Sequence, residues 1–174
     1  MAVVTDLKGY LEPCGCTSDP LGGIDRMAGA LEELRKDDAP LVVLLAGDAF
    51  FDAAPLERAR ADQANRNAKT LVRILNRLGV TAVLPGERDR QQPADVIASL
   101  RRDADFPWLA MEDDPGVLIH EAGGLSIAIV GARNGTQPDK VKSAVSRARE
   151  RAELTMVLVD GSRRDANRVG AIEG

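Results

Sequence analysis

Acidic residues follow four short aliphatic runs of this sequence, and carboxylates in that position can bind metal ions or transfer protons. Asp6 and Asp48 follow the first two runs, Glu87 comes soon after the third, and Asp160 follows the last. Ligands of open α/β sheets bind beyond the carboxyl ends of the strands. A single acidic residue there needs no explanation, but four together indicate a functional site. We therefore expect these carboxylates to converge.

Converging carboxylates repel one another unless a metal ion or a basic side chain balances them. Lys8 lies two positions after Asp6, and Arg88 directly follows Glu87. Such cations form charge-assisted pairs with carboxylates. They also repel a metal, since two unit charges about 4 Å apart interact by about 4 kcal/mol at an effective dielectric of about 20. The remaining oxygen ligands suit a hard ion such as Mg²⁺ or Ca²⁺.

Softer ligands are scarce. Cys14 and Cys16 are separated only by Gly15, so a disulfide between them would be strained. Two thiolates supply half of a tetrahedral zinc site. The pair is therefore either two loop thiols, a redox pair or part of a soft-metal site. His120 is the single histidine, which excludes a site that needs several imidazoles.

Alternating aliphatic runs and helical periodicity predict an α/β fold with a mainly parallel sheet and an antiparallel hairpin. Residues 9–23, which hold four glycines, two prolines and both cysteines, are expected to form a loop. Strands are expected at 2–5, 41–46, 80–84, 106–110, 117–121, 125–131 and 154–159, and helices at 24–34, 68–78, 93–103 and 140–152.

Length and composition limit the possible functions of the chain. The 174 residues predict one domain over 1–174. The net charge of −4 argues against a nucleic-acid partner. No apolar run approaches the roughly 20 residues of a transmembrane segment. No charged segment followed by an apolar one opens the chain, so no export signal is visible.

Several motifs occur in an order and spacing that resemble a known family. They are Asp6-Leu7-Lys8-Gly9, Gly22-Gly23-Ile24-Asp25-Arg26, Gly47-Asp48 and Gly86-Glu87-Arg88-Asp89, followed by a hairpin at 120–131 and a strand that ends at Asp160. This series resembles the 5′-nucleotidase branch of the calcineurin-like metallophosphoesterases. The resemblance implies a layered αββα sandwich, here with a reduced or truncated second sheet.

The metal-binding positions of that family are only partly kept. Family members bind two metal ions through aspartates, histidines and one asparagine. Asp6 and Asp48 match this pattern, with Asp48 at the position that bridges the metals. The other positions differ: Lys8 and Asp160 stand in place of histidine ligands, Glu87 in place of the asparagine, and Arg88 in place of the catalytic histidine that precedes Asp89.

These departures predict a catalytically degenerate domain that binds no metal and serves as a binding or assembly module. An arginine does not give up its proton, so the general acid is lost as well. The alternative is an active phosphoesterase or nucleotidase that holds one or two divalent ions with Asp6, Asp48, Glu87 and Asp160. An incomplete second sheet predicts a protein partner or self-association. The resemblance implies an exported or periplasmic location.

Overall fold

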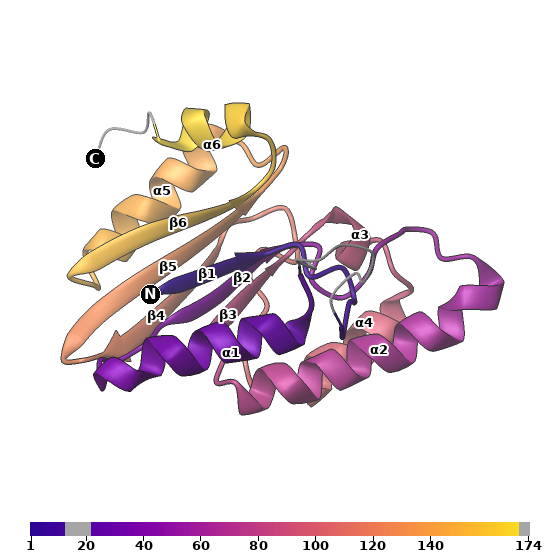
Figure 1. Ribbon diagram of the computed structural model, residues 1–174. Helices are drawn as coiled ribbons and strands as arrows, with labels where there is room; N and C mark the ends of the chain where they lie inside the picture. Colours follow the sequence, from indigo (N-terminus) through magenta and orange to yellow (C-terminus); the bar gives the residue numbers. More distant parts are fainter. Residues whose placement is uncertain (13–21, 171–174) are drawn as a thin grey trace.

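The computed structural model describes residues 1–12 and 22–170, whose strands form two sheets (Figure 1). The first sheet is parallel throughout, in the order β1-β2-β3. The second has the order β4-β5-β6, with β4 antiparallel and β6 parallel to β5. The strands are β1 (Ala2–Thr5), β2 (Val43–Gly47), β3 (Ala82–Pro85), β4 (Gly116–Ala122), β5 (Leu125–Arg133) and β6 (Leu154–Asp160).

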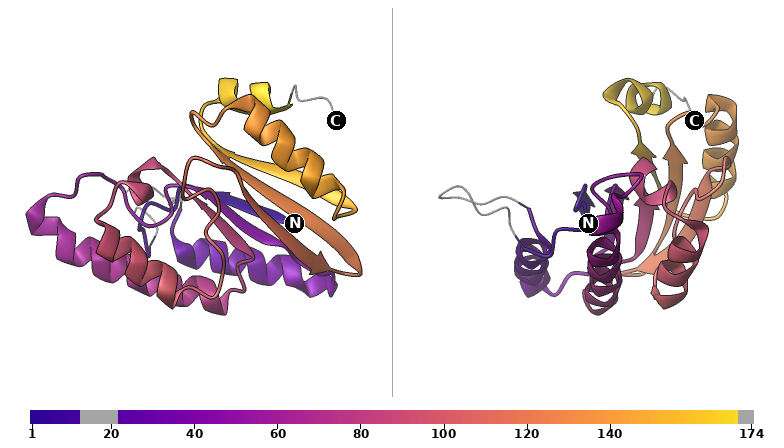
Figure 2. Two further views of the ribbon diagram at one scale, coloured as in Figure 1. Left: turned by 180° about the vertical axis from the view of Figure 1, so that it is seen from behind. Right: turned by 90° about the vertical axis from the view of Figure 1, so that its right-hand side faces the viewer.

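Helices cover the outer faces of the two sheets (Figures 1 and 2). On the first sheet lie α1 (Ile24–Leu34), α2 (Arg58–Arg77) and α4 (Ala94–Asp103). On the side of the second sheet lie α5 (Pro138–Arg149) and α6 (Arg163–Gly170). Two short helices, η1 (Arg35–Asp37) and α3 (Glu87–Arg90), follow α1 and β3. The expected αββα order of layers is confirmed, with three strands in the described part of the second sheet.

The central strand β2 of the first sheet is buried on both faces, and its successive side chains point to opposite sides. Val43 and Leu45 of β2 pack with the cluster formed by α1, α2 and α4. Leu44 and Ala46 pack on the opposite side, against the second sheet. All four are buried. The continuous apolar run of β2 is thus explained, because its side chains fill the hydrophobic cores on both sides of the strand.

The same alternation in β5 joins the second sheet to its helix. Ile127 and Ile129 face the first sheet, whereas Ala128 and Val130 pack against α5. Small residues of α5, including Ala144, complete that outer cluster. The two sheets are thereby held face to face by aliphatic packing, and their strand ends are fixed relative to each other.

One expectation about local structure needs correction. Residues 106–110 form no strand: only an isolated bridge joins Trp108 to Val83. Pro107 has no N–H to give to a ladder, and this segment instead runs beside β3, with the Leu109 N–H donating to the carbonyl of Val83. The segment after β3, to which the sequence pattern assigned no element, forms the short helix α3.

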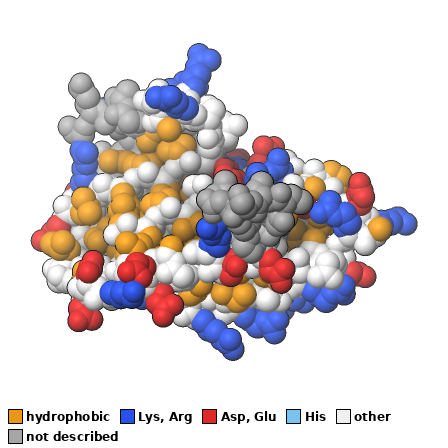
Figure 3. Space-filling model, viewed as in Figure 1, with side chains coloured by type: hydrophobic (Ala, Val, Ile, Leu, Met, Phe, Trp, Pro, Cys, Tyr) orange, Lys and Arg blue, Asp and Glu red, His pale blue; other side chains and the backbone are white. Residues whose placement is uncertain are grey.

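Three strands have one edge free in the described residues. β1 pairs only with β2, and β4 and β6 each pair only with β5. Val3 of β1 and Leu154 of β6 are each about half exposed. Hydrophobic side chains gather on the face of the molecule that carries these two strands (Figure 3). No helix of the described residues is both long and apolar enough to cross a membrane.

Candidate functional site

The predicted convergence of carboxylates is observed. Asp6, Asp48, Glu87 and Asp160 line one open pocket of about 400 Å³. Parallel pairing of β1, β2 and β3 brings the ends of these strands to one edge of the first sheet. β6 of the second sheet adds Asp160 from the opposite layer. The pocket also includes Asn134 and Ser162, which the sequence motifs did not indicate because they lie in loops.

Asp48 is held by Arg88. The Arg88 side chain donates from Nη1 to Asp48 Oδ2 at 3.0 Å, and the Arg88 backbone N–H donates to Oδ1 at 2.8 Å. Both oxygens of this carboxylate therefore have a donor. The Asp48 side chain is 13% exposed and the Arg88 side chain 43%. Within this ion pair, Asp48 is thus largely buried, whereas Arg88 is open to solvent.

Gly86 makes the approach of Asp48 to α3 possible. A Cβ built on Gly86 would lie 2.3 Å from Asp48 Oδ1 and 2.4 Å from the Asp48 backbone nitrogen. Any side chain at this position therefore clashes with the backbone as well as with the carboxylate. The Gly86 N–H also donates to the Gly47 carbonyl at 2.9 Å. A glycine at position 86 is therefore needed for the ends of β2 and β3 to lie this close together.

Arg90 holds Asp160 in the same manner. Its Nη1 donates to Asp160 Oδ2 at 3.0 Å and also to the Pro85 carbonyl. Both side chains are largely buried, at 12% and 18% exposed. Burial raises the pKa of Asp160, while the hydrogen bond and the charge of Arg90 act in the opposite direction. Sequence reasoning missed Arg90, because only the helical turn of α3 brings its side chain to Asp160.

Lys8 does not join the four carboxylates. It lies only two residues after Asp6, yet both residues have left-handed backbone angles, with φ of 54° at Asp6 and 53° at Lys8. Asp6 lines the carboxylate pocket, whereas Lys8 lines a separate pocket beside α2. The two cations paired with the carboxylates are therefore Arg88 and Arg90, not the expected Lys8 and Arg88.

Asp89 is fully buried and faces away from the pocket. Its carboxylate accepts hydrogen bonds from the backbone N–H groups of Ala49, Phe50 and Phe51, at 2.7, 3.0 and 3.0 Å. Burial raises its pKa to about 7, although these hydrogen bonds act to lower it. In this arrangement Asp89 fixes the loop that follows Asp48.

The remaining candidate ligands lie elsewhere. His120 pairs with Ile127 in the β4–β5 hairpin and does not line the carboxylate pocket. Cys14 and Cys16 fall outside the described residues, so the thiol-site hypothesis stays untested.

The carboxylate pocket contains the oxygen ligands that a hard cation prefers, but these ligands are not arranged as a metal site. Within residues 1–12 and 22–170, no three His, Cys, Asp or Glu side chains lie close enough together to hold a metal ion. Asp48 and Asp160 are each directed to an arginine, and Glu87 accepts a hydrogen bond from Gln91. The residues as placed therefore do not fit a metal centre, and no reaction step through a metal follows from them.

Comparisons with known proteins support the fold. Neither a scan of protein families nor a search of curated proteins finds a match. Among solved structures, the chain is similar to a "Putative 5'-Nucleotidase" from Staphylococcus aureus in complex with alpha-ketoglutarate, with a TM-score of 0.70 and 16% identity over 92% of this chain and 36% of that one.

A second solved structure gives the same result. The sulfate thiohydrolase SoxB from Thermus thermophilus, in complex with glycerol, matches with a TM-score of 0.69 and 18% identity, over 89% of this chain and 33% of that one. The chain thus spans about a third of the length of these two proteins. The likeness establishes a mixed α/β fold of the nucleotidase type, as the motifs predicted.

Proposed function

We propose that residues 1–174 form a single metallophosphoesterase-like domain that has lost its metal centre and acts as a binding or assembly module. In this proposal, arginine side chains balance the negative charge of the carboxylates, as metal ions do in the family. Asp6, Asp48, Glu87 and Asp160 are then former ligand positions, and Arg88 stands in the former place of the catalytic histidine.

The observation that carries this proposal is the Arg88–Asp48 pair. The carboxylate at the family's metal-bridging position accepts from both the side chain and the backbone of Arg88. A dication at Asp48 would have to displace the guanidinium or lie close to it, and like charges at such distances repel by several kcal/mol. The guanidinium also keeps its proton at neutral pH, so it supplies no general acid.

Hydrolysis assays test the proposal. The purified protein is incubated with Mn²⁺, Zn²⁺ or Mg²⁺ and with bis(p-nitrophenyl) phosphate or a nucleoside monophosphate. We expect no metal-dependent turnover above that of the Asp48→Asn variant, which serves as the matched control. Robust turnover that Asp48→Asn abolishes would overturn the proposal.

One observation favours a second candidate, a hydrolase with an all-carboxylate site. The four acidic side chains do share a pocket, and Asp6 and Glu87 have no ion pair with any described residue. Small shifts of these exposed side chains would bring more oxygens toward a bound Mg²⁺. This candidate requires that Asp48→Asn remove metal binding and turnover together, and elemental analysis that finds no bound metal would count against it.

The assembly role rests on the open strand edges. Unpaired backbone groups of β1 and β6, with exposed Val3 and Leu154 beside them, form the surface on which a further strand can pair. We propose that this surface binds a protein partner or a second copy of the chain. An exported or periplasmic location is the part of the proposal that rests on family resemblance alone.

A further inference from the structure

The second sheet ends short of the first on one side of the molecule. Its last strand, β6, contacts β2 and β3 across the interface between the sheets, and no strand of the described residues pairs with the other edge of β6. β1 lies beyond β2 in the first sheet, so it extends past this free edge. A step is therefore left between the free edge of β6 and the face of β1 that points toward the second sheet (Figure 1).

The exposure of β1 follows from this step. The parallel register places Val3 beside Leu44 and Thr5 beside Ala46 of β2. Residues at paired positions share a face of the sheet, and both of these β2 residues face the second sheet. Val3 thus has the same orientation as Leu44, yet Leu44 is fully buried and Val3 is 48% exposed. The difference arises because the second sheet does not reach over β1.

β6 supplies the other wall of the step. Met156 and Leu158 pack into the core between the two sheets. Leu154 points to the same side, because it lies two residues before Met156 in the strand, but it is 49% exposed. Hydrophobic side chains gather on this face of the molecule (Figure 3). A strand added to the free edge of β6 would lie over β1 and cover both Val3 and Leu154.

The step runs into the carboxylate pocket, because Asp6 follows β1 and Asp160 ends β6. Among the described residues that line this pocket there are four carboxylates and no lysine or arginine. Two of the carboxylates are paired with arginines. Asp6 and Glu87 are exposed and have no ion pair with any described residue. The pocket therefore keeps a negative charge, and a basic side chain is its complement.

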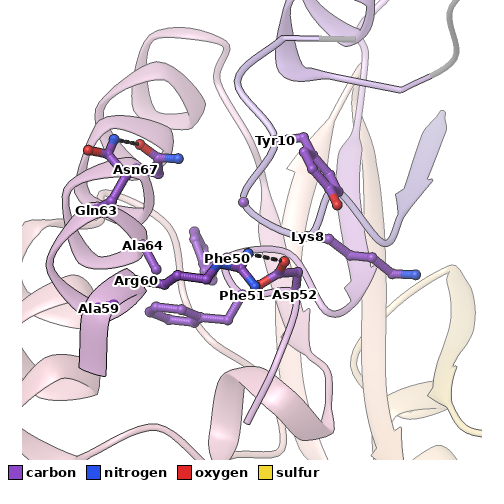
Figure 4. A pocket seen from close by; sticks show the side chains of 11 residues that line it. Lys8, Tyr10, Phe50, Phe51, Asp52, Ala59, Arg60, Gln63, Ala64 and Asn67 are labelled. Carbon is purple, nitrogen blue, oxygen red and sulfur yellow. Dashed lines mark hydrogen bonds and ion pairs between the residues drawn. The ribbon is translucent and has the colours of Figure 1, made fainter. Parts of the chain in front are cut away.

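The pocket beside α2 does not offer the same combination (Figure 4). Of the side chains that line it, Phe50 and Phe51 are each 1% exposed, so neither is available to a partner. Arg60 and Asp52 form an ion pair at 2.7 Å, so their charges balance. At the step, by contrast, exposed apolar side chains adjoin an excess of negative charge.

We propose that the free edge of β6 binds an extended segment of a partner protein, with an arginine or lysine at one end of the segment in the carboxylate pocket. This inference rests on the proposed binding role of the domain and specifies the chemistry of its partner. In strand addition, backbone hydrogen bonds supply affinity and alternate side chains supply specificity. β6 has seven residues, so a segment of about that length, with apolar side chains toward Val3, matches the edge.

The test measures binding of fluorescently labelled, capped peptides of the length of β6 by anisotropy, at a concentration of the full chain at which light scattering shows a monomer. Each peptide alternates valine with threonine and carries arginine at its N-terminal or its C-terminal end, because the direction of the added strand decides which end reaches the pocket. We expect one of the two to bind saturably. Replacing its arginine with glutamate, or a central threonine with proline, should weaken binding at least about tenfold.

Two variants of the chain locate the bound peptide. Val3→Lys puts a charge on the face of β1 that the peptide would cover, and Asp6→Asn removes a charge from the pocket. Each should weaken binding of the arginine peptide about tenfold. The matched controls are Leu34→Lys, at an equally exposed position of α1, and Asp95→Asn, on the exposed side of α4. Both controls should bind as the unchanged chain does.

The proposal is overturned if neither arginine peptide binds saturably, if the glutamate peptide binds equally well, or if Val3→Lys or Asp6→Asn leaves the affinity unchanged. Self-association that neither arginine peptide inhibits would assign the edge to a second copy of the chain and would also overturn it. Any of these results leaves the loss of the metal centre standing, because the hydrolysis assays do not depend on the edge of β6. Metal-dependent turnover would instead overturn the proposed function, whether or not a peptide binds.

Discussion

Arg90 joins the two sheets of this protein through its ion pair with Asp160. The arginine follows β3 of the first sheet and the aspartate ends β6 of the second, and the Nη1–Oδ2 distance is 3.0 Å. The same guanidinium donates to the Pro85 carbonyl. One positive charge therefore holds two strand-end groups together, the Pro85 carbonyl at the end of β3 and the Asp160 carboxylate at the end of β6.

Arg90→Met should lower the free energy of unfolding by about 2–4 kcal/mol, because it leaves Asp160 largely buried without its partner. Urea unfolding at neutral pH measures this loss. Arg102→Met is the matched control: it breaks only the exposed contact with Asp103 and should change stability by less than about 1 kcal/mol.

The loss in Arg90→Met should also depend on pH. Without the arginine, the burial that already raises the pKa of Asp160 is unopposed. The folded variant then binds a proton more readily than the unfolded chain does, so its stability falls as pH rises. The penalty should be smaller near pH 4 than at pH 8. An equal penalty at both values would show that Arg90 acts through packing alone.

Gly86→Ala should destabilise the protein by about 1–3 kcal/mol, the usual cost of overpacking. The new methyl group would meet Asp48 backbone and side-chain atoms at 2.4 and 2.3 Å. Gly29→Ala, within α1 and with nothing within 4 Å of the added carbon, should instead stabilise by about 0.5–1 kcal/mol. Thermal and urea unfolding of both variants check the contrast, and equal effects would contradict the close approach at Gly86.

Asp89 should make stability fall with rising pH. Burial raises the pKa of its carboxyl from 3.8 to about 7 in the folded protein. Between these values the folded state binds more protons than the unfolded state, so its contribution to stability is full below about pH 4 and is lost as pH rises through 7. Urea unfolding across pH 4–8 measures the slope.

Asp89→Asn tests whether that slope belongs to Asp89. The amide cannot titrate, so the pH dependence in this window should become flatter. It should also cost about 1–3 kcal/mol, because its NH₂ group meets a backbone N–H that had an acceptor. Asp95→Asn, on the exposed first turn of α4, should leave the slope unchanged and lower the stability by less than about 1 kcal/mol, because it removes only a charge near the helix N-terminus. A slope that persists in Asp89→Asn would assign it to other groups.

The open edges of β1 and β6 predict concentration-dependent self-association. Light scattering on size-exclusion eluate should show a mass that grows with protein concentration. Leu154→Lys puts a charge on the edge of β6 and should shift the protein to monomer, as charged edges do in natural sheets. Lys142→Leu, on the exposed side of α5, alters the charge elsewhere and should not. A monomer at every concentration would contradict self-association, and the surface would then have to bind a different protein.

Much of the fold followed from the sequence, because apolar periodicity depends on local geometry. The runs at 2–5, 41–46 and 154–159 are strands β1, β2 and β6 to within about two residues, and the hairpin lies where Ala122 and Leu125 flank two glycines. The division into two sheets was available only from the family resemblance, since strand spacing does not specify which strands pair.

The candidate site was predictable in its acidic half only. Acidic residues at strand ends converge because parallel strands end at one edge. The basic half depended on backbone detail: Asp6 and Lys8 have left-handed angles, and Lys8 does not line the carboxylate pocket. The turn of α3 places Arg90 opposite Asp160. Neither the left-handed backbone angles nor the exact turn of α3 can be predicted from the sequence motifs.

The most direct test of the account is the affinity of the protein for Mn²⁺, measured by calorimetry on the unchanged chain and on Arg88→Ala. If the guanidinium takes the place of a metal at Asp48, the unchanged chain should show no saturable site in the carboxylate pocket. Arg88→Ala, which removes that positive charge, should bind Mn²⁺ at least about tenfold more tightly. Tight, stoichiometric binding by the unchanged chain that Asp48→Asn removes would contradict the account.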